Sequence, residues 1–413
     1  MLGIAPAQTA ETTGTPPSVS PVADSASPIQ VTDHYDSGIT PPFSIDGNVI
    51  TFDFSGVTFP YIDCELRGPP GAVTVRLRLN ARGTLFYGQQ GLYVSADGEM
   101  FTLQPLTKLG ETTRTMEANG KVEKVIDTDF EAVVTIGSSG RVRLSCSDPY
   151  GRDHLEKLLC DTANSSVGQW RFLRKHNRSL VLFELGEDDG KKPIHHIFAG
   201  EDNRETECQW AADRMIRKLC EDPALARELG KRAVIRICPV VSPYTSSTRD
   251  HNSYASETTG KDVYGAAKWA ANPLPAELDI LYGLMQEALA QRRLGFVLTM
   301  HSWWAGKPVT EIETIRSAGA NQLSPARAAW AKTTMQTFMD GVPHANVTLP
   351  ERIWYPGILR EVMLARHNAV TFRVEITTLN QPTPRGETTA VRFLQNLVRL
   401  ENWRPVWDPS ATE

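Results

Sequence analysis

The chain has 413 residues, of which 41% are apolar and 22% charged, and its formal net charge is −5. This length predicts two domains, and the composition is that of a soluble globular protein. The net charge indicates neither a nucleic acid nor a membrane surface as partner, and no apolar run approaches the roughly 18–20 residues that cross a bilayer.

The first 30 residues are rich in Thr, Ser, Pro and Ala and contain no Lys or Arg. Such a segment cannot bury enough apolar surface to offset its chain entropy, so we predict that residues 1–30 form a disordered tail. The tail lacks the basic-then-apolar order of a secretory signal. Six scattered cysteines without a CxxC pair indicate free thiols in a reducing compartment, which predicts a cytoplasmic protein.

Residues 31–147 alternate apolar and polar side chains in short runs, which is the pattern of half-buried strands. The predicted strands occupy 48–54, 72–79, 90–103, 131–136 and 141–146, with a hairpin turn at Asp97-Gly98. Several short strands at close intervals predict a β-sandwich domain. No cluster of His and carboxylate residues lies in this part, which favours a supporting or recognition role.

Residues 148–413 alternate between strands and helices, which predicts an α/β domain with a mixed, largely parallel sheet flanked by helices. The predicted strands are 179–185, 192–200, 232–241, 295–302 and 369–376. The predicted helices are 152–163, 205–221, 275–292, 324–341 and 388–400. No GxGxxG, GxxxxGK[ST] or GxSxG motif occurs, which argues against a nucleotide-phosphate loop and against a serine-hydrolase elbow.

Three polar residues follow or close predicted strands, at the edge of an α/β sheet where ligands usually bind. Glu201 follows "IHHIF", His301 closes "GFVLTM", and Glu375 lies near the end of "AVTFRVE". A carboxylate and an imidazole suit Zn²⁺, and a further carboxylate suits a general base. Spacing alone is a weak signal, because a single His at a strand end is more often a hydrogen-bonded structural residue.

The chain resembles the zinc metallocarboxypeptidases, especially the cytosolic branch with an N-terminal β-sandwich. That family carries a His-x-x-Glu pair at a strand-to-helix junction, a later "HS" histidine, and a glutamate in a "TxE"-like strand. This chain has "FAGE" (198–201), "MHS" (300–302) and "TFRVE" (371–375) in the same order. The resemblance covers roughly 150–385. It implies zinc ligation by Glu201 and His301, with Glu375 as general base.

The resemblance is uneven at three positions. Phe198 stands at the first ligand position, and a phenylalanine cannot coordinate a metal. The "NPDG" segment appears as "SPYT" (242–245), and Gly265 replaces the arginine of the "D-x-N-R" motif that holds the substrate's C-terminal carboxylate. The resemblance further implies Arg249 as the group that polarises the scissile carbonyl. It implies Lys268 as a partial substitute for the lost arginine and Tyr355 as a substrate tyrosine.

His195 and His196 are the nearest replacements for the lost ligand. His196 shares a strand face with Phe198 but lies about 6.6 Å before it, whereas His195 points to the opposite face. We therefore treat His196 as a possible rescue ligand and expect both to be structural histidines.

Two functions from different classes follow from these observations. The first is metal-dependent hydrolysis of a peptide C-terminal or related amide bond, with degenerate metal and carboxylate sites. The second is an inactive homologue that binds a peptide or protein tail; an amidohydrolase acting on small acyl amino acids is a further alternative. The expected partners are therefore a peptide tail or a small amide, and not a nucleic acid or a membrane.

Overall fold

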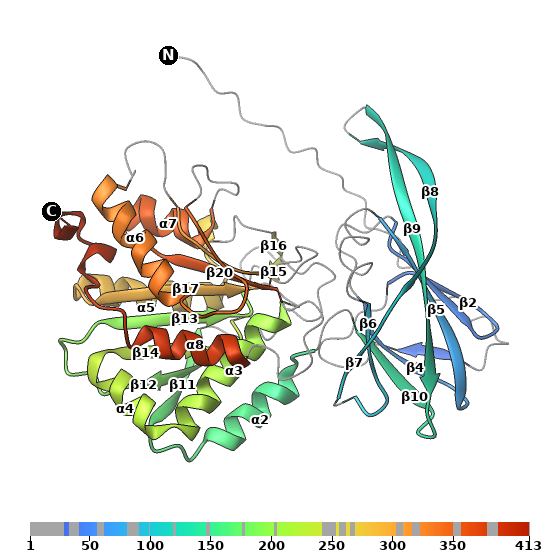
Figure 1. Ribbon diagram of the computed structural model, residues 1–413, viewed down its shortest axis with the longest axis horizontal. Helices are drawn as coiled ribbons and strands as arrows, with labels where there is room; N and C mark the ends of the chain where they lie inside the picture. The colour runs from blue at the N-terminus through green and yellow to red at the C-terminus, as the bar shows by residue number, and fades with distance from the viewer. Residues whose placement is uncertain are drawn as a thin grey trace.

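The computed structural model describes residues 29–32, 41–55, 62–80, 91–98, 100–118, 121–145, 149–175, 178–201, 205–241, 253–255, 262–264, 269–302, 309–315, 323–349, 357–377 and 387–412. Two groups of sheets make up this part of the chain (Figure 1). Strand β1 begins at Gln30, at the end of the segment predicted to be disordered, and residues 1–28 lie outside the described residues.

The N-terminal strands form two five-stranded sheets, with the orders β1-β4-β10-β6-β7 and β2-β3-β5-β9-β8. Alternate residues of both sheets, such as Leu66 and Val75, are buried in one shared hydrophobic core, as the alternating sequence pattern predicts. The strands are β1 (Gln30–Thr32), β2 (Phe43–Asp46), β3 (Val49–Asp53), β4 (Asp63–Arg67), β5 (Gly71–Leu79), β6 (Leu92–Ser95), β7 (Thr102–Gln104), β8 (Thr107–Ala118), β9 (Lys121–Ile136) and β10 (Arg141–Ser145).

The C-terminal part contains an eight-stranded mixed sheet, in the order β11-β12-β14-β13-β17-β20-β18-β19. Its four central strands, β14, β13, β17 and β20, are mutually parallel, which confirms the predicted fold class. The strands are β11 (Gly168–Lys175), β12 (Arg178–Leu185), β13 (Ile194–Ala199), β14 (Val234–Cys238), β17 (Leu294–His301), β18 (Val309–Glu313), β19 (Ala345–Thr348) and β20 (Phe372–Thr377). A separate pair consists of β15 (Ser253–Ala255) and β16 (Asp262–Tyr264).

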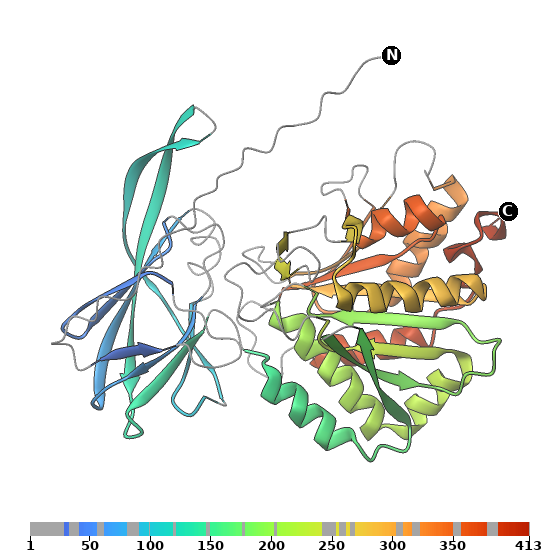
Figure 2. The same cartoon turned by 180° about the vertical axis from the view of Figure 1, so that it is seen from behind.

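Helices cover both faces of this sheet. Figure 1 shows α3 and α8 on the near face, and Figure 2 shows α5 on the opposite one. The helices are α2 (Arg152–Thr162), α3 (Thr206–Glu221), α4 (Pro223–Arg232), α5 (Ala276–Ala290), α6 (Pro325–Phe338), α7 (Leu359–His367) and α8 (Glu387–Leu397), followed by the 3-10 turns η3 (Arg404–Val406) and η4 (Pro409–Thr412). No helix among the described residues has the length and apolar character needed to cross a membrane.

The C-terminal core packs tightly around the start of β17. His195 of β13 accepts a hydrogen bond at Nδ1 from the backbone N–H of Phe296 (2.9 Å), and its ring contacts Trp403 edge-on. A Cβ at Gly295 would lie 2.2 Å from His195 Nδ1, which no side chain tolerates without movement. Glycine at 295 is therefore required by the neighbouring histidine.

We expect Gly295→Ala to destabilise the protein by about 1–3 kcal/mol, because the added methyl group overpacks a closed core. Gly283→Ala is the matched control: this glycine lies within α5, and a methyl group there would meet no neighbouring atom within 4 Å. Alanine there should stabilise by about 0.5–1 kcal/mol. Urea unfolding of both variants measures the two effects. Equal unfolding midpoints would contradict the packing argument.

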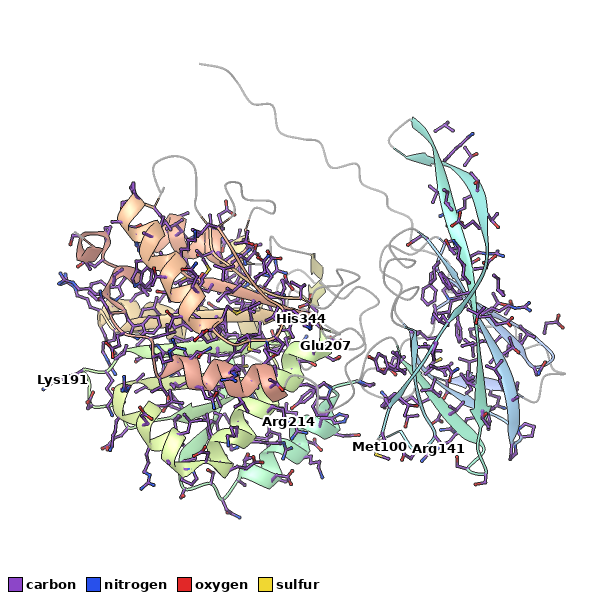
Figure 3. All side chains as sticks on the ribbon, viewed as in Figure 1. Met100, Arg141, Lys191, Glu207, Arg214 and His344 are labelled. Carbon is purple, nitrogen blue, oxygen red and sulfur yellow. The ribbon has the colours of Figure 1, made fainter. Side chains whose placement is uncertain are left out.

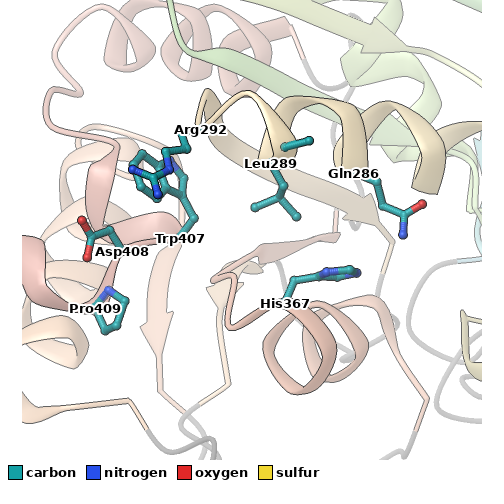
Figure 4. A pocket seen from close by; sticks show the side chains of 8 residues that line it. Gln286, Leu289, Arg292, His367, Trp407, Asp408 and Pro409 are labelled. Carbon is teal, nitrogen blue, oxygen red and sulfur yellow. The ribbon is translucent and has the colours of Figure 1, made fainter.

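A surface pocket of about 620 Å³ lies at the ends of α5 and α7, lined by Gln286, Leu289, Ala290, Arg292, His367, Trp407, Asp408 and Pro409 (Figure 4). Arg292 precedes the first residue of β17, whereas His301 is its last residue. The pocket is therefore at the opposite edge of the sheet from the strand ends where Glu201, His301 and Glu375 lie. It contains none of the predicted site residues.

Candidate functional site

The candidate site begins where β13 ends. Ala199 is the last residue of this strand, and Gly200 follows with φ +66°, a conformation that side chains other than glycine rarely adopt. A Cβ at Gly200 would also lie 2.4 Å from Gln209 Nε2 of α3. The sharp turn leads to Glu201, and α3 begins at Thr206, directly after Glu205. Figure 3 labels Glu207 in the first turn of this helix.

His301 lies between two buried carboxylates. Its Nε2 is 3.4 Å from Glu201 Oε2, and its Nδ1 is 2.9 Å from Glu205 Oε2. Glu201, Glu205 and His301 are only 4%, 5% and 5% exposed. Such burial strengthens each electrostatic contact, since little water is present to screen it. The two carboxylates therefore flank the imidazole on opposite sides.

Neighbouring groups fix both carboxylates further. Trp269 Nε1 donates a hydrogen bond to Glu201 Oε1 (2.6 Å), and the backbone N–H of Ser302 donates to Glu205 Oε2 (3.1 Å). Ser302 Oγ accepts a hydrogen bond from the N–H of Cys208, in the first turn of α3 (3.1 Å). These contacts tie the end of β17 to the start of α3.

Glu375 lies on the strand next to His301, and the two residues are direct register partners of β20 and β17. Its carboxylate forms an ion pair with Arg373, two residues earlier on the same strand face. Burial raises the pKa of Glu375, while the positive charges of Arg373 and Arg360 oppose that rise. The structure thus brings all three predicted strand-end residues, Glu201, His301 and Glu375, to one edge of the sheet.

Phe198 is fully buried in the core of the α/β part, and its ring contacts that of His196 (5.7 Å between centroids). His196 pairs with Arg236 on one side and with Val297 on the other. Val297 lies four residues before His301, or about 13 Å along the strand. The structure therefore does not bring His196 to the Glu201–His301 pair, and a rescue role for it is not supported.

Several predicted residues cannot be placed. Arg249, Lys268 and Tyr355, and also Gly265 and the "SPYT" segment, lie outside the described residues. Their assigned roles in carbonyl polarisation and substrate binding stay predictions.

A catalytic zinc normally has three protein ligands and one water. Among the described residues, no group of three His, Cys, Asp or Glu side chains is placed to hold one metal ion. Glu201 and Glu205 approach opposite nitrogens of His301, so an ion at either nitrogen would meet the histidine and one glutamate. The described donor set does not fit a three-ligand zinc centre.

Sequence reasoning missed Glu205 and Trp269. Trp269 is 68 residues from Glu201 in the chain, and no local pattern links the two. Glu205 carried a usable signal, because it is the first residue of the helix predicted at 205–221, at the same strand-to-helix junction as Glu201.

Comparison with solved structures decides the fold. A metallo-carboxypeptidase from Burkholderia cenocepacia superposes with a TM-score of 0.67 at 14% identity, over 90% of this chain and 98% of that one. The chain has a metallo-carboxypeptidase fold. A metallo-carboxypeptidase from Pseudomonas aeruginosa, solved with (2-guanidinoethylmercapto)succinic acid, gives a TM-score of 0.62 at 13% identity, over 92% and 98% of the two chains. No protein-family model and no curated protein matches the sequence.

These matches confirm the fold that the sequence resemblance implied. Both matches extend over nearly the whole chain, so they include the N-terminal sheets as well as the α/β part. At 13–14% identity the likeness concerns the fold alone.

Proposed function

We propose that this metallo-carboxypeptidase-fold protein binds a peptide or protein tail, or a small amide, at the ends of β13, β17 and β20 without holding a catalytic zinc. The observation that supports this is the arrangement around His301. Its two ring nitrogens face Glu205 and Glu201 at 2.9 and 3.4 Å, and Trp269 donates to Glu201. Each ring nitrogen thus faces one carboxylate, which gives two protein ligands on either side instead of the three of a catalytic zinc.

A second candidate function is metal-dependent hydrolysis of a peptide C-terminal or related amide bond. Glu205 favours it, because this residue contacts His301 and directly precedes α3. The sequence Asp202-Asn203-Arg204-Glu205 also keeps the spacing of a His-x-x-Glu pair, with an aspartate in place of the histidine. Aspartate is an accepted zinc ligand. Asp202 lies outside the described residues, so this candidate rests on spacing and on the Glu205–His301 contact.

Metal analysis and zinc calorimetry of protein purified without added zinc distinguish the two functions. We expect substoichiometric zinc, rapid loss to chelators, and no release of amino acids from peptides, because a two-ligand site holds metal weakly. Peptide binding measured by fluorescence anisotropy should persist with chelator present. Tight, stoichiometric zinc together with peptide hydrolysis would overturn the binding function in favour of the hydrolase.

Glu201→Gln and Glu205→Gln are matched variants for the same titration. Each removes one negative charge from one side of His301 and keeps the side-chain volume. If zinc does bind, the variant that abolishes binding identifies the ligating carboxylate. A loss confined to Glu205→Gln would place the metal on the Nδ1 side and support the Asp202-x-x-Glu205 pair.

We propose a cytoplasmic location, because the described cysteines favour a reducing compartment. Cys64, Cys160, Cys208, Cys220 and Cys238 are all free thiols. Secreted proteins more often pair such residues in disulfides.

A further inference from the structure

The surface pocket at the ends of α5 and α7 has the size and composition of a site for a small molecule (Figure 4). Its volume of about 620 Å³ falls within the range of about 300–1,000 Å³ that ligand pockets occupy. Four of its eight lining residues, Leu289, Ala290, Trp407 and Pro409, are apolar, and the other four carry polar groups. Apolar walls with a few polar groups are the usual form of a ligand site.

Arg292 supplies the free charge of this pocket. Its side chain is exposed, and its guanidinium forms no hydrogen bond or ion pair with another described residue. A guanidinium is always protonated and has no acceptor atom, so it binds anionic groups through its N–H donors. All of these donors are available to a ligand that enters the pocket.

The backbone holds Arg292 in a conformation that favours glycine. Its φ is +55°, and the residue after the last turn of a helix is usually glycine when the chain turns this way. The N–H groups of Arg292 and Arg293 donate to Leu289 O and Ala288 O (both 2.8 Å), which closes the end of α5. The helix end itself would therefore be formed with less strain by a glycine.

The other charged group of the pocket is compensated. Asp408 forms an ion pair with Arg404 (2.8 Å between Oδ2 and Nε). His367 Nε2 lies 2.6 Å from the hydroxyl oxygen of Tyr282, which fixes the imidazole ring. Burial lowers the pKa of His367, so this ring is neutral at neutral pH. Among the described lining residues, Arg292 thus has the one positive charge without a partner.

Trp407 adds an aromatic surface to this positive charge. Its indole ring is partly buried and packs against the core of the α/β part, so a ligand that stacks on it does not have to order it first. Aromatic rings in offset stacks gain more than their buried area alone implies. A ligand that has both an aromatic ring and a negative charge can therefore use Trp407 and Arg292 together.

We propose that this pocket binds a small planar aromatic molecule with one negative charge, its ring against Trp407 and its charged group at Arg292. The pocket and the ends of β13, β17 and β20 lie at opposite edges of the sheet, so this inference does not depend on the proposed function. It explains why an arginine without a partner stands where the backbone favours glycine.

Calorimetric titration with four small compounds tests the class of ligand. Naphthoate and naphthalenesulfonate have the aromatic ring and the negative charge, naphthalenemethanol has the ring alone, and decalincarboxylate has the charge on a saturated skeleton. We expect both aromatic anions to bind at least about tenfold more tightly than the alcohol, because only they pair a negative charge with the guanidinium. They should also bind more tightly than decalincarboxylate, which cannot stack. The stronger of the two identifies the anionic group that the pocket prefers.

Arg292→Gly removes the cation at a position where glycine fits the backbone. Its unfolding midpoint in urea should be unchanged or higher, whereas the preference for the aromatic anions over the alcohol should be lost. Arg227→Met is the matched control, because it removes an equal charge from the exposed surface of α4, outside the pocket. Trp407→Leu should abolish the preference over decalincarboxylate. An arginine that served only the end of α5 would change stability and leave both preferences intact.

Two kinds of result would overturn the inference. If Arg292→Gly keeps the preference for the aromatic anions, these anions bind elsewhere on the protein. If the unmodified protein binds the alcohol as tightly as the anions, or binds none of the four compounds, the pocket does not select this class of ligand. Neither result affects peptide binding at the strand ends, which is measured separately.

Discussion

A Phe198→His variant should bind zinc about a hundredfold or more tightly than the unmodified protein, because ligand number governs the affinity of a zinc site. Phe198 lies on β13 opposite Thr299 of β17, two residues before His301 on that neighbouring strand. An imidazole at 198 would be the third protein ligand that the described residues lack. Calorimetric titration with ZnCl₂ measures the change.

Two controls make the zinc titration specific. Phe198→Leu disturbs the same buried position without supplying a nitrogen, so it should not raise zinc affinity. Adding His301→Ala to Phe198→His should abolish the gain. Equal and weak zinc binding by Phe198→His and the unmodified protein would show that position 198 does not face the metal position, and the proposed correspondence of "FAGE" with the family motif would be wrong.

Arg327→Leu should destabilise the protein by about 3–5 kcal/mol, because it removes several hydrogen bonds from a charged donor, each of which contributes about 1.5–3 kcal/mol. Arg327, in the first turn of α6, is 1% exposed and donates from Nε to Pro405 O (2.7 Å), from Nη1 to Asn368 Oδ1 (2.7 Å) and from Nη2 to Val406 O (2.6 Å). Leucine removes all of these donors, and of the three acceptors Val406 O keeps the N–H of Val370 as a partner. The unfolding midpoint in urea measures the loss.

Arg404→Leu is the control for Arg327→Leu. Arg404 lies in the same C-terminal segment, but its ion pair with Asp408 is exposed to solvent, where such pairs contribute little. Its unfolding midpoint should stay nearly unchanged. A similar loss in both variants would mean that the segment, and not the guanidinium, determines the stability.

The apolar periodicity of the sequence predicted the strands and helices that bury one face against the core. The strand predicted at 295–302 is Leu294–His301, and the helix predicted at 205–221 is Thr206–Glu221. The long hairpin of β8 and β9 was largely missed, because Thr, Lys and Glu residues fill much of both strands. Before Thr128, β9 pairs only with β8 in the described sheet, and the composition of this part shows little apolar alternation.

The candidate site was predictable only in part. Strand-end positions located Glu201, His301 and Glu375, because parallel strands end at one edge of the sheet. The contacts that decide the chemistry join distant parts of the chain: Glu205 with His301, Trp269 with Glu201, and Arg360 with Glu313. No local spacing predicts such pairs, since they depend on how the helices pack against the sheet.

The hydrogen bonds around Arg327 also bear on the order in which the protein folds during synthesis. The N–H of Val370, just before β20, donates to Val406 O, and Arg327 donates to the same carbonyl. The α/β core also includes Trp403 and Val406, whereas the core of the N-terminal sheets is built from residues between Ile29 and Leu144. On the ribosome, the N-terminal sheets can therefore close early. The α/β core cannot be completed until residue 406 has emerged, although its central strands are synthesised earlier. Until then its apolar strands are exposed to chaperones.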